Sequence, residues 1–133
     1  MTDEEYKDLH KKIIEEQKAI CQKYNVEWTP SSPDMKIGIS KNIKSSTMPI
    51  NGLRHPVEKE TAGWYIWAGD FSDKDDFFDP VHVEHLSDDL PIVLKYLGLP
   101  PGWRFQIDDK GHEDVWFDEK LLGYWGQPLF MIY

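Results

Sequence analysis

The chain has 133 residues, of which 40% are hydrophobic and 29% are charged. This length and balance predict one soluble globular domain, whose core can form without disulfides or a structural metal. Cys21 is the only cysteine, which excludes an internal disulfide and a cysteine-rich zinc site. No stretch is long and apolar enough to span a membrane, and the acidic N-terminus is unlike a secretory signal, so we expect a cytoplasmic protein.

The charge balance is strongly acidic, with 24 acidic residues against 15 basic ones and a net charge of −9. Nucleic acids are held mainly by Lys and Arg, so we expect neither a nucleic acid nor an anionic membrane as a partner. A macromolecular partner is expected to be basic, because complementary fields speed and orient the encounter. The alternative is that the acidity only keeps the protein soluble.

Residues 3–24 are predicted to form one long amphipathic helix. Thr2 can cap this helix, and Glu5 completes a capping box. Apolar residues recur at steps of three and four, namely Tyr6, Leu9, Ile13, Ile14, Ile20, Cys21 and Tyr24. The opposite side is mostly charged. We expect the apolar stripe to pack on this protein's own sheet; packing on a partner helix is the alternative.

Strands are predicted after the turn-rich linker at residues 29–34, where the hydrophobic period changes to two. The first covers residues 36–40. A second, at residues 47–57, is expected to be interrupted by a turn at Asn51-Gly52 and ended by Pro56. Residues 63–68 form the strongest strand pattern, and residues 81–86 alternate again.

The third of these strands carries Trp64 and Trp67, three residues apart. They should therefore lie on opposite faces of the sheet. We expect one of the two in the core and the other either exposed or covered by the first helix or the C-terminal tail.

Ser87 is predicted to cap a helix over residues 88–97, with Pro91 in its first turn and Gly98 at its end. Residues 103–107 and 114–117 predict a hairpin around residues 108–111. The apolar segment 121–133 is expected to dock on the body. The fold class is therefore α+β: a long N-terminal amphipathic helix on a mostly antiparallel sheet, with one short internal helix. We expect a single domain over residues 1–133, made of a helical part (1–28), a body (36–118) and a tail (119–133).

Residues 70–79 contain five Asp and are the most unusual segment of the chain. The glycine and glutamate of an EF-hand calcium loop are not in place, so a solvated loop or a protein-binding loop fits better. Phe71, Phe77 and Phe78 favour protein binding, because aromatic anchors ringed by charge are typical of binding hot spots. The candidate partner-binding residues are Asp73, Asp75, Asp76, Phe77, Phe78 and Asp79, with Asp108 and Asp109 of the hairpin turn as a second group.

Signs of catalysis or metal binding are weak. His82 and His85 could share a metal on a helix, but on the predicted strand they point to opposite faces. His112 and Glu113 lie at a turn. There is no HExxH motif, no nucleophile elbow and no phosphate loop, and Cys21 falls on the apolar side of the first helix. We expect no enzyme, no cofactor and no bound metal.

A family resemblance rests on the order of several short motifs: Ser40-Lys41, Arg54, Gly63-Trp64, Gly69-Asp70 and a following acidic segment, then Leu97, Pro101-Gly102, Phe105 and Val115-Trp116. This order resembles a family of bacterial immunity proteins paired with polymorphic toxins, the family numbered thirty-three. The resemblance covers residues 36–118. An Asp-Ser pair precedes Gly-Trp in the family pattern, whereas Thr61-Ala62 stands here. The resemblance implies a binding protein that neutralises a cognate toxin domain by occluding it, and it implies no catalytic residues. Its motif residues in this chain are Arg54, Gly63, Trp64, Gly69 and Asp70.

The charge pattern agrees with this implication. Residues 70–89 contain eight acids and one Lys, and residues 108–119 contain six acids and one Lys. Together they would form an acidic face of charge −12 if the sheet brought them side by side, which suits a toxin with a basic substrate groove. Two alternatives stay open: a small metal-dependent enzyme or metal-binding protein using residues 70–79 with a nearby His, and a regulatory scaffold with another partner.

Overall fold

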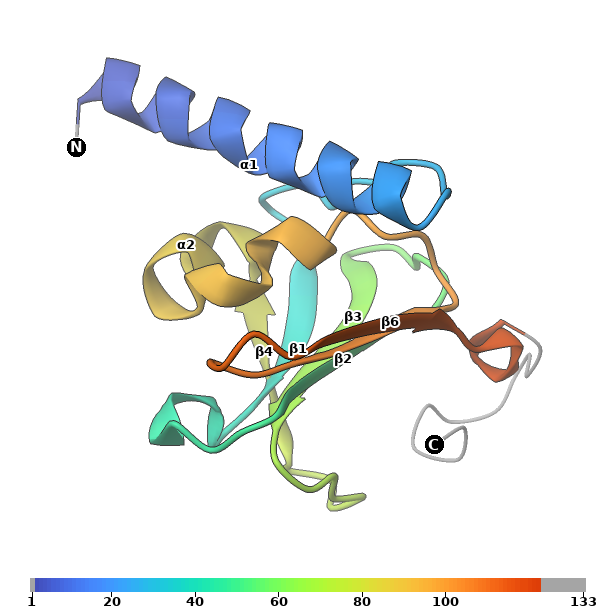
Figure 1. Ribbon diagram of the computed structural model, residues 1–133. Coiled ribbons are helices and arrows are strands. Elements are labelled where there is room, and N and C mark those ends of the chain that lie inside the picture. The colour runs from blue at the N-terminus through green and yellow to red at the C-terminus, as the bar shows by residue number, and fades with distance from the viewer. Residues whose placement is uncertain (1, 123–133) are drawn as a thin grey trace.

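The computed structural model describes residues 2–122 and places a long helix over a six-stranded sheet (Figure 1). The strands are β1 (Lys36–Ser40), β2 (Ile50–Arg54), β3 (Thr61–Ala68), β4 (Phe78–His82), β5 (Trp103–Ile107) and β6 (Glu113–Phe117). Their order in the sheet is β4-β1-β3-β2-β5-β6. Only β1 and β3 pair in parallel, and the other neighbours are antiparallel. The predicted α+β class with a mostly antiparallel sheet is confirmed.

Helical segments cover one face of this sheet, which we call the helix-covered face. They are α1 (Asp3–Lys23), α2 (Leu86–Asp89) and the 3₁₀ helix η3 (Pro91–Tyr96), with η3 lying between α1 and the sheet (Figure 1). The largest core cluster lies here and includes Ile20, Trp64, Tyr96 and Phe105. We call the opposite side the aromatic face, because Tyr65, Trp67, Phe71, Phe77 and Phe78 pack together there.

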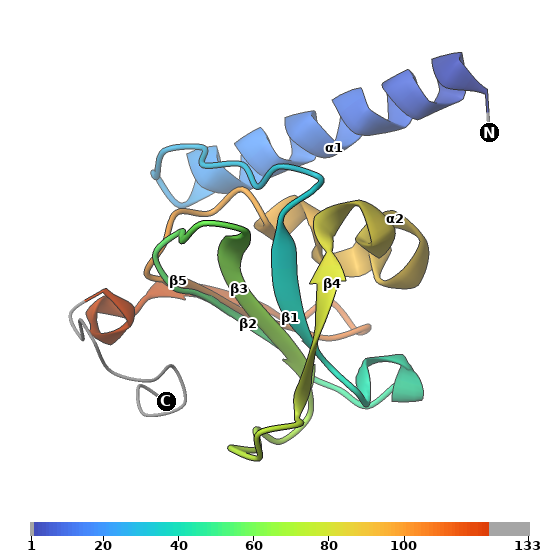
Figure 2. The same ribbon diagram turned by 180° about the vertical axis from the view of Figure 1, so that it is seen from behind.

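The predicted N-terminal helix forms, but its apolar stripe is buried only toward its C-terminal end. The capping box is present: Thr2 Oγ1 accepts the N–H of Glu5 at 3.1 Å, and Glu5 accepts the N–H of Thr2. Ile20 is buried in the core, whereas Tyr6 is 56% exposed and Leu9 is 36% exposed. The first turns of α1 extend beyond the body in both views (Figures 1 and 2). The expectation that the whole stripe packs on the sheet is therefore wrong for its N-terminal part.

The turn expected at Asn51-Gly52 does not exist, because both residues lie inside β2. A Cβ atom at Gly52 would stand 2.2 Å from Cε2 of Phe105 on the neighbouring strand. Gly52 thus allows the aromatic ring of Phe105 to lie close to the backbone. Besides a bend in the chain, such a close approach is a common reason for a glycine within a strand.

The segment that follows the acidic loop differs most from the sequence prediction. The strand β4 begins at Phe78 and ends at His82, and the 3₁₀ helix η2 (Val83–His85) and α2 follow it directly. Ser87 lies inside α2 rather than at its cap. Pro91 disfavours a helical residue before it, and Leu90 accordingly leaves the helical region, with φ −153° and ψ 62°. The expected helix over 88–97 is therefore divided into α2 and η3.

The C-terminal hairpin of β5 and β6 forms as predicted, with β6 starting one residue earlier at Glu113. Beyond it, Leu121 in the 3₁₀ helix η4 (Glu119–Leu121) is buried on the aromatic face. The rest of the apolar tail, residues 123–133, lies outside the described residues. Within residues 2–122 no helix is long and apolar enough to cross a lipid bilayer.

Candidate partner-binding site

The acidic loop, residues 69–77, connects β3 to β4 and is fastened at both ends to the aromatic face. Trp67 packs edge-on against Phe71, with ring centroids 5.4 Å apart, and against Phe78 at 6.3 Å. Phe77 packs on Phe71 at 5.8 Å and on Phe78 at 4.8 Å. All three Phe are half-buried. The three Phe rings therefore hold the loop on its own sheet. The sequence had suggested exposed rings that anchor a partner.

Carboxylates occupy the tip of this loop. Asp73, Asp75 and Asp76 are exposed, and none of them forms an ion pair with another of the described residues. Asp79 lies in β4, where its carboxylate is 3.4 Å from Nζ of Lys41. The tip thus presents three solvated carboxylates from a backbone that is anchored on each side.

The hairpin turn, which carries the second predicted group, is organised differently. Oδ1 of Asp108 accepts the backbone N–H groups of His112 at 2.9 Å and Lys110 at 2.8 Å. These two hydrogen bonds lower the pKa of Asp108. Asp108 therefore stabilises its own turn, while the neighbouring Asp109 is exposed.

The two acidic segments lie at the same end of the sheet. Ile50 at the start of β2 pairs with Ala68, the last residue of β3, and with Ile107, the last residue of β5. Side-chain hydrogen bonds cross this end of the aromatic face. Asn51 donates to the carbonyl of Gly69 at 3.2 Å and accepts from Gln106 at 3.0 Å.

They do not form one continuous acidic face, however. The 3₁₀ helix η1 (Ile43–Ser45) lies at the same end, and the hairpin turn and the acidic loop end at separate places there in both views (Figures 1 and 2). Lys44 of η1 pairs with Asp89 at 3.4 Å, and Lys41 pairs with Asp79. The charge of −12 summed over both segments therefore does not act at one place.

The family-motif residue Arg54 is completely buried. Its guanidinium donates to three backbone carbonyls, those of Ala62 at 2.9 Å, Thr29 at 2.6 Å and Leu99 at 2.7 Å. Burial lowers the pKa of Arg54 to about 10. A buried charge is tolerated only when it is hydrogen-bonded. Through these hydrogen bonds Arg54 holds together the linker, β3 and the segment after η3.

The remaining motif residues also support the fold. Gly63 has φ +89°, and a Cβ atom there would stand 2.0 Å from the carbonyl oxygen of His55, so no other residue fits. Trp64 is completely buried, and its indole N–H donates to the carbonyl of Leu97 at 3.3 Å. Gly69 turns the chain out of β3 with φ +70°. Only Asp70 is exposed. The motif residues thus stabilise the part of the sheet from which the acidic loop projects.

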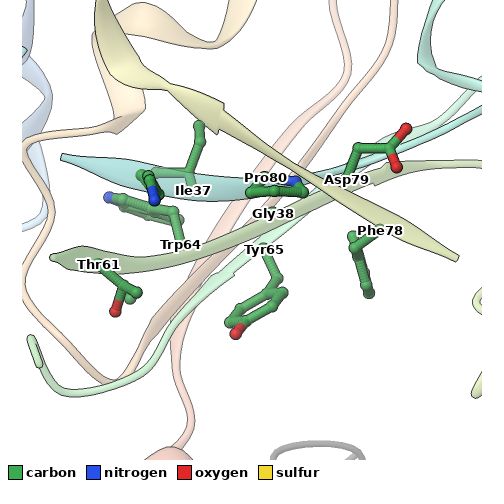
Figure 3. A pocket seen from close by; sticks show the side chains of 10 residues that line it. Ile37, Gly38, Thr61, Trp64, Tyr65, Phe78, Asp79 and Pro80 are labelled. Atoms are coloured by element: carbon green, nitrogen blue, oxygen red, sulfur yellow. The ribbon is translucent and has the colours of Figure 1, made fainter. Parts of the chain in front are cut away.

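A shallow cavity of about 230 Å³ lies where the register of β1 and β3 slips (Figure 3). Gly38 allows the ring of Tyr65 to lie against the backbone there, since a Cβ atom would stand 2.7 Å from that ring. The lining is apolar apart from Lys36, Thr61 and Asp79. Lys36 and Asp79 each form an ion pair with a residue outside the lining, namely Glu60 and Lys41.

The histidines were placed wrongly by the sequence prediction. Because β4 ends at His82 and η2 follows, His82 and His85 lie on the same side, with ring centroids 6.0 Å apart. Residues three apart in a 3₁₀ helix eclipse one another. Glu84 completes a cluster whose ligand atoms all lie within 4.8 Å of one another, and residues 2–122 contain no second group of three such side chains at this spacing. Residues 70–79 take no part in it.

Glu113 belongs to a structural network rather than to a reactive site. Its carboxylate accepts hydrogen bonds from Lys23 at 2.6 Å, Tyr24 at 2.7 Å and Tyr96. Burial alone would raise the pKa of Glu113, but these hydrogen bonds outweigh burial and bring the pKa to about 2. The network links the end of α1, η3 and β6.

Cys21 also has a contact within the fold: its thiol donates to the carbonyl of Gly98 at 3.3 Å, and burial raises the pKa of this thiol.

Comparison with known proteins gives one match. A family model of the Imm33-like domain matches residues 16–118, from the buried half of α1 to the residue after β6. No curated protein matches the chain, and no solved structure matches it. The matched range contains the buried motif of Arg54, Gly63 and Trp64 together with the acidic loop, and it extends the range expected from the sequence by twenty residues toward the N-terminus. The chain therefore belongs to the family of Imm33-like domains, the immunity-protein family that its motifs resemble.

Proposed function

We propose that this protein is an immunity protein that binds a cognate bacterial toxin domain through the acidic loop and occludes a basic surface on it. Family membership supports a protein partner. The structural observation that carries the proposal is the exposure of Asp73, Asp75 and Asp76 on an anchored loop. These carboxylates form no internal ion pair that binding would have to break. The loop is already anchored on the sheet, so it loses little conformational entropy when it binds.

The charges and the rings have different roles in this proposal. The carboxylates set the association rate and its dependence on salt, because they act at a distance before contact. Phe77 and Phe78 hold the loop in one conformation, and the part of each ring that remains exposed would be covered by the partner. Their loss should therefore increase the dissociation rate. Asp109 of the hairpin turn, with Asp108 behind it, would contact the edge of a large partner.

The first experiment looks for a toxin domain among the neighbouring genes and measures binding to it at two salt concentrations. The variant Asp75→Lys/Asp76→Lys should slow association about tenfold at low salt, and the difference should shrink at high salt. A matched control, Glu15→Lys/Glu16→Lys, makes the same change in net charge on exposed residues of α1. If both double variants slow association equally, net charge alone would explain the effect and the loop would lose its role.

A second experiment separates an immunity protein from a scaffold with another partner. Cells that express the toxin domain should survive when the parental protein is co-expressed, and protection should weaken with the loop variant in proportion to its loss of affinity. Absence of both binding and protection with the neighbouring toxin would contradict the proposed function and favour the regulatory scaffold.

A further inference from the structure

The segment after β4 gathers three ligating side chains on one side of the backbone. We propose that His82, Glu84 and His85 form a binding site for one divalent transition-metal cation, with zinc as its representative. The inference is independent of the toxin-binding proposal. His82 lies at the opposite end of β4 from the acidic loop, about 13 Å along the strand at the usual rise per residue.

The backbone of this segment is held in place by the rest of the fold. The N–H of Val83 donates to the carbonyl of Met35 at 2.9 Å, and the N–H of Glu84 donates to that of Pro33 at 3.0 Å. Val83 packs against the core, and Leu86 is 1% exposed. Because the apolar residues of the segment turn inward, the three ligating side chains lie together on its outer side.

The spacing of the donor atoms suits a metal after small side-chain rotations. All three donors lie within 4.8 Å of one another, and Oε1 of Glu84 is already 4.0 Å from Nε2 of His85. A tetrahedral zinc ion with bonds near 2.0–2.1 Å brings its ligand atoms to about 3.3 Å from each other. The side chains of His85 and Glu84 are 60% and 54% exposed, so both have solvent-filled space in which to rotate toward the ion.

The donor set selects the class of metal. Two imidazoles and one carboxylate suit zinc, nickel and copper, whereas calcium and magnesium prefer sites made wholly of oxygen. Three protein ligands leave a fourth position for water or for a partner's side chain. The nearest basic neighbour by strand register is Lys36, opposite His82, and its Nζ lies 3.6 Å from Glu60, so part of its charge is balanced there.

The test is a titration of the full-length protein, without a histidine tag, with zinc chloride in a calorimeter. We expect one saturable site per chain. Zinc at ten times its dissociation constant should raise Tm by about 3–6 °C, because it stabilises only the folded state. Calcium and magnesium should produce no shift. In a two-dimensional NMR spectrum, zinc should move the ring signals of His82 and His85 together.

Single substitutions test which residues bind the zinc ion. His85→Ala should weaken zinc binding at least tenfold, and Glu84→Gln should weaken it to a smaller extent. The matched control is His112→Ala, since His112 is exposed and hydrogen-bonds to Gln106 outside the cluster. His85 is exposed as well, so its replacement should leave the circular dichroism spectrum and the metal-free Tm unchanged. Unsaturable binding by the parent, or equal affinity in the parent and in His85→Ala, would overturn the inference.

Discussion

Trp64 and Trp67 stand three residues apart on β3 and are both buried, at 0% and 5% exposure, but on opposite faces of the sheet. Trp64 belongs to the large core under η3 and α1. Trp67 belongs to the smaller cluster with Leu53 and Leu121, in which the rings come from the acidic loop (Phe71, Phe77) and from the strands (Tyr65, Phe78). The sequence predicted opposite faces correctly, but it did not predict that this loop would cover the second Trp. The helix-covered face thus holds the domain together, whereas the aromatic face holds one exposed loop in position.

The largest effect is expected on the helix-covered face. Trp64→Ala removes the largest fully buried ring of the core and its hydrogen bond to Leu97, and it should reduce the free energy of unfolding by about 3–5 kcal/mol. Chemical denaturation monitored by circular dichroism measures this loss. Hydrogen exchange should accelerate throughout the sheet, because this cluster joins helices and strands.

The matching change on the aromatic face should have a smaller and more local effect. Trp67→Ala should reduce the free energy of unfolding by about 2–4 kcal/mol, since the loop rings can partly close the gap. Amide exchange should accelerate in residues 70–77 while the buried half of α1 keeps its protection. If Trp64→Ala and Trp67→Ala gave the same exchange pattern, the two faces would not have the separate roles described above.

Acid should weaken the helix-covered face specifically through Glu113. Its folded pKa of about 2 lies below its ordinary value of 4.5, so its contribution is complete above pH 4.5 and is lost as the pH falls toward 2. Glu113→Gln should reduce stability by about 1–3 kcal/mol at neutral pH, because three hydrogen bonds lose their charged acceptor. Denaturation curves between pH 7 and 2 should show the parent approaching the variant. A constant difference across that range would contradict this role.

The smallest effect is expected where α1 leaves the body. Leu9→Ala should change the free energy of unfolding by less than about 0.5 kcal/mol, since Leu9 is 36% exposed and lies outside both clusters. Ile20→Ala, on the buried half of the same helix, should cost about 2–4 kcal/mol. The family match begins at residue 16 and so also leaves out these exposed turns. A large loss with Leu9→Ala would show that these turns are packed after all.

Local patterns in the sequence were enough for the elements whose causes lie within a few residues. The capping box of Thr2 and Glu5, the alternating strand β1 and the hairpin of β5 and β6 all formed as predicted. The predictions failed where a distant residue competes. Gly52 is explained by Phe105, which is far away in sequence. The division of α2 from η3 is an exception, because it is a local effect of Pro91 on Leu90.

The composition of the candidate site could be predicted from the sequence, because clustered Asp and Phe are visible in any reading of residues 70–79. The sequence also determined the family, through short motifs whose order survives without a structure. Only the tertiary structure decided what these residues do. It turned the Phe rings inward onto Trp67, buried Arg54 among three carbonyls and ended β4 at His82, so that His85 lies beside it. Each of these outcomes depends on contacts between segments far apart in the chain, and such contacts leave no periodic or local signal in the sequence.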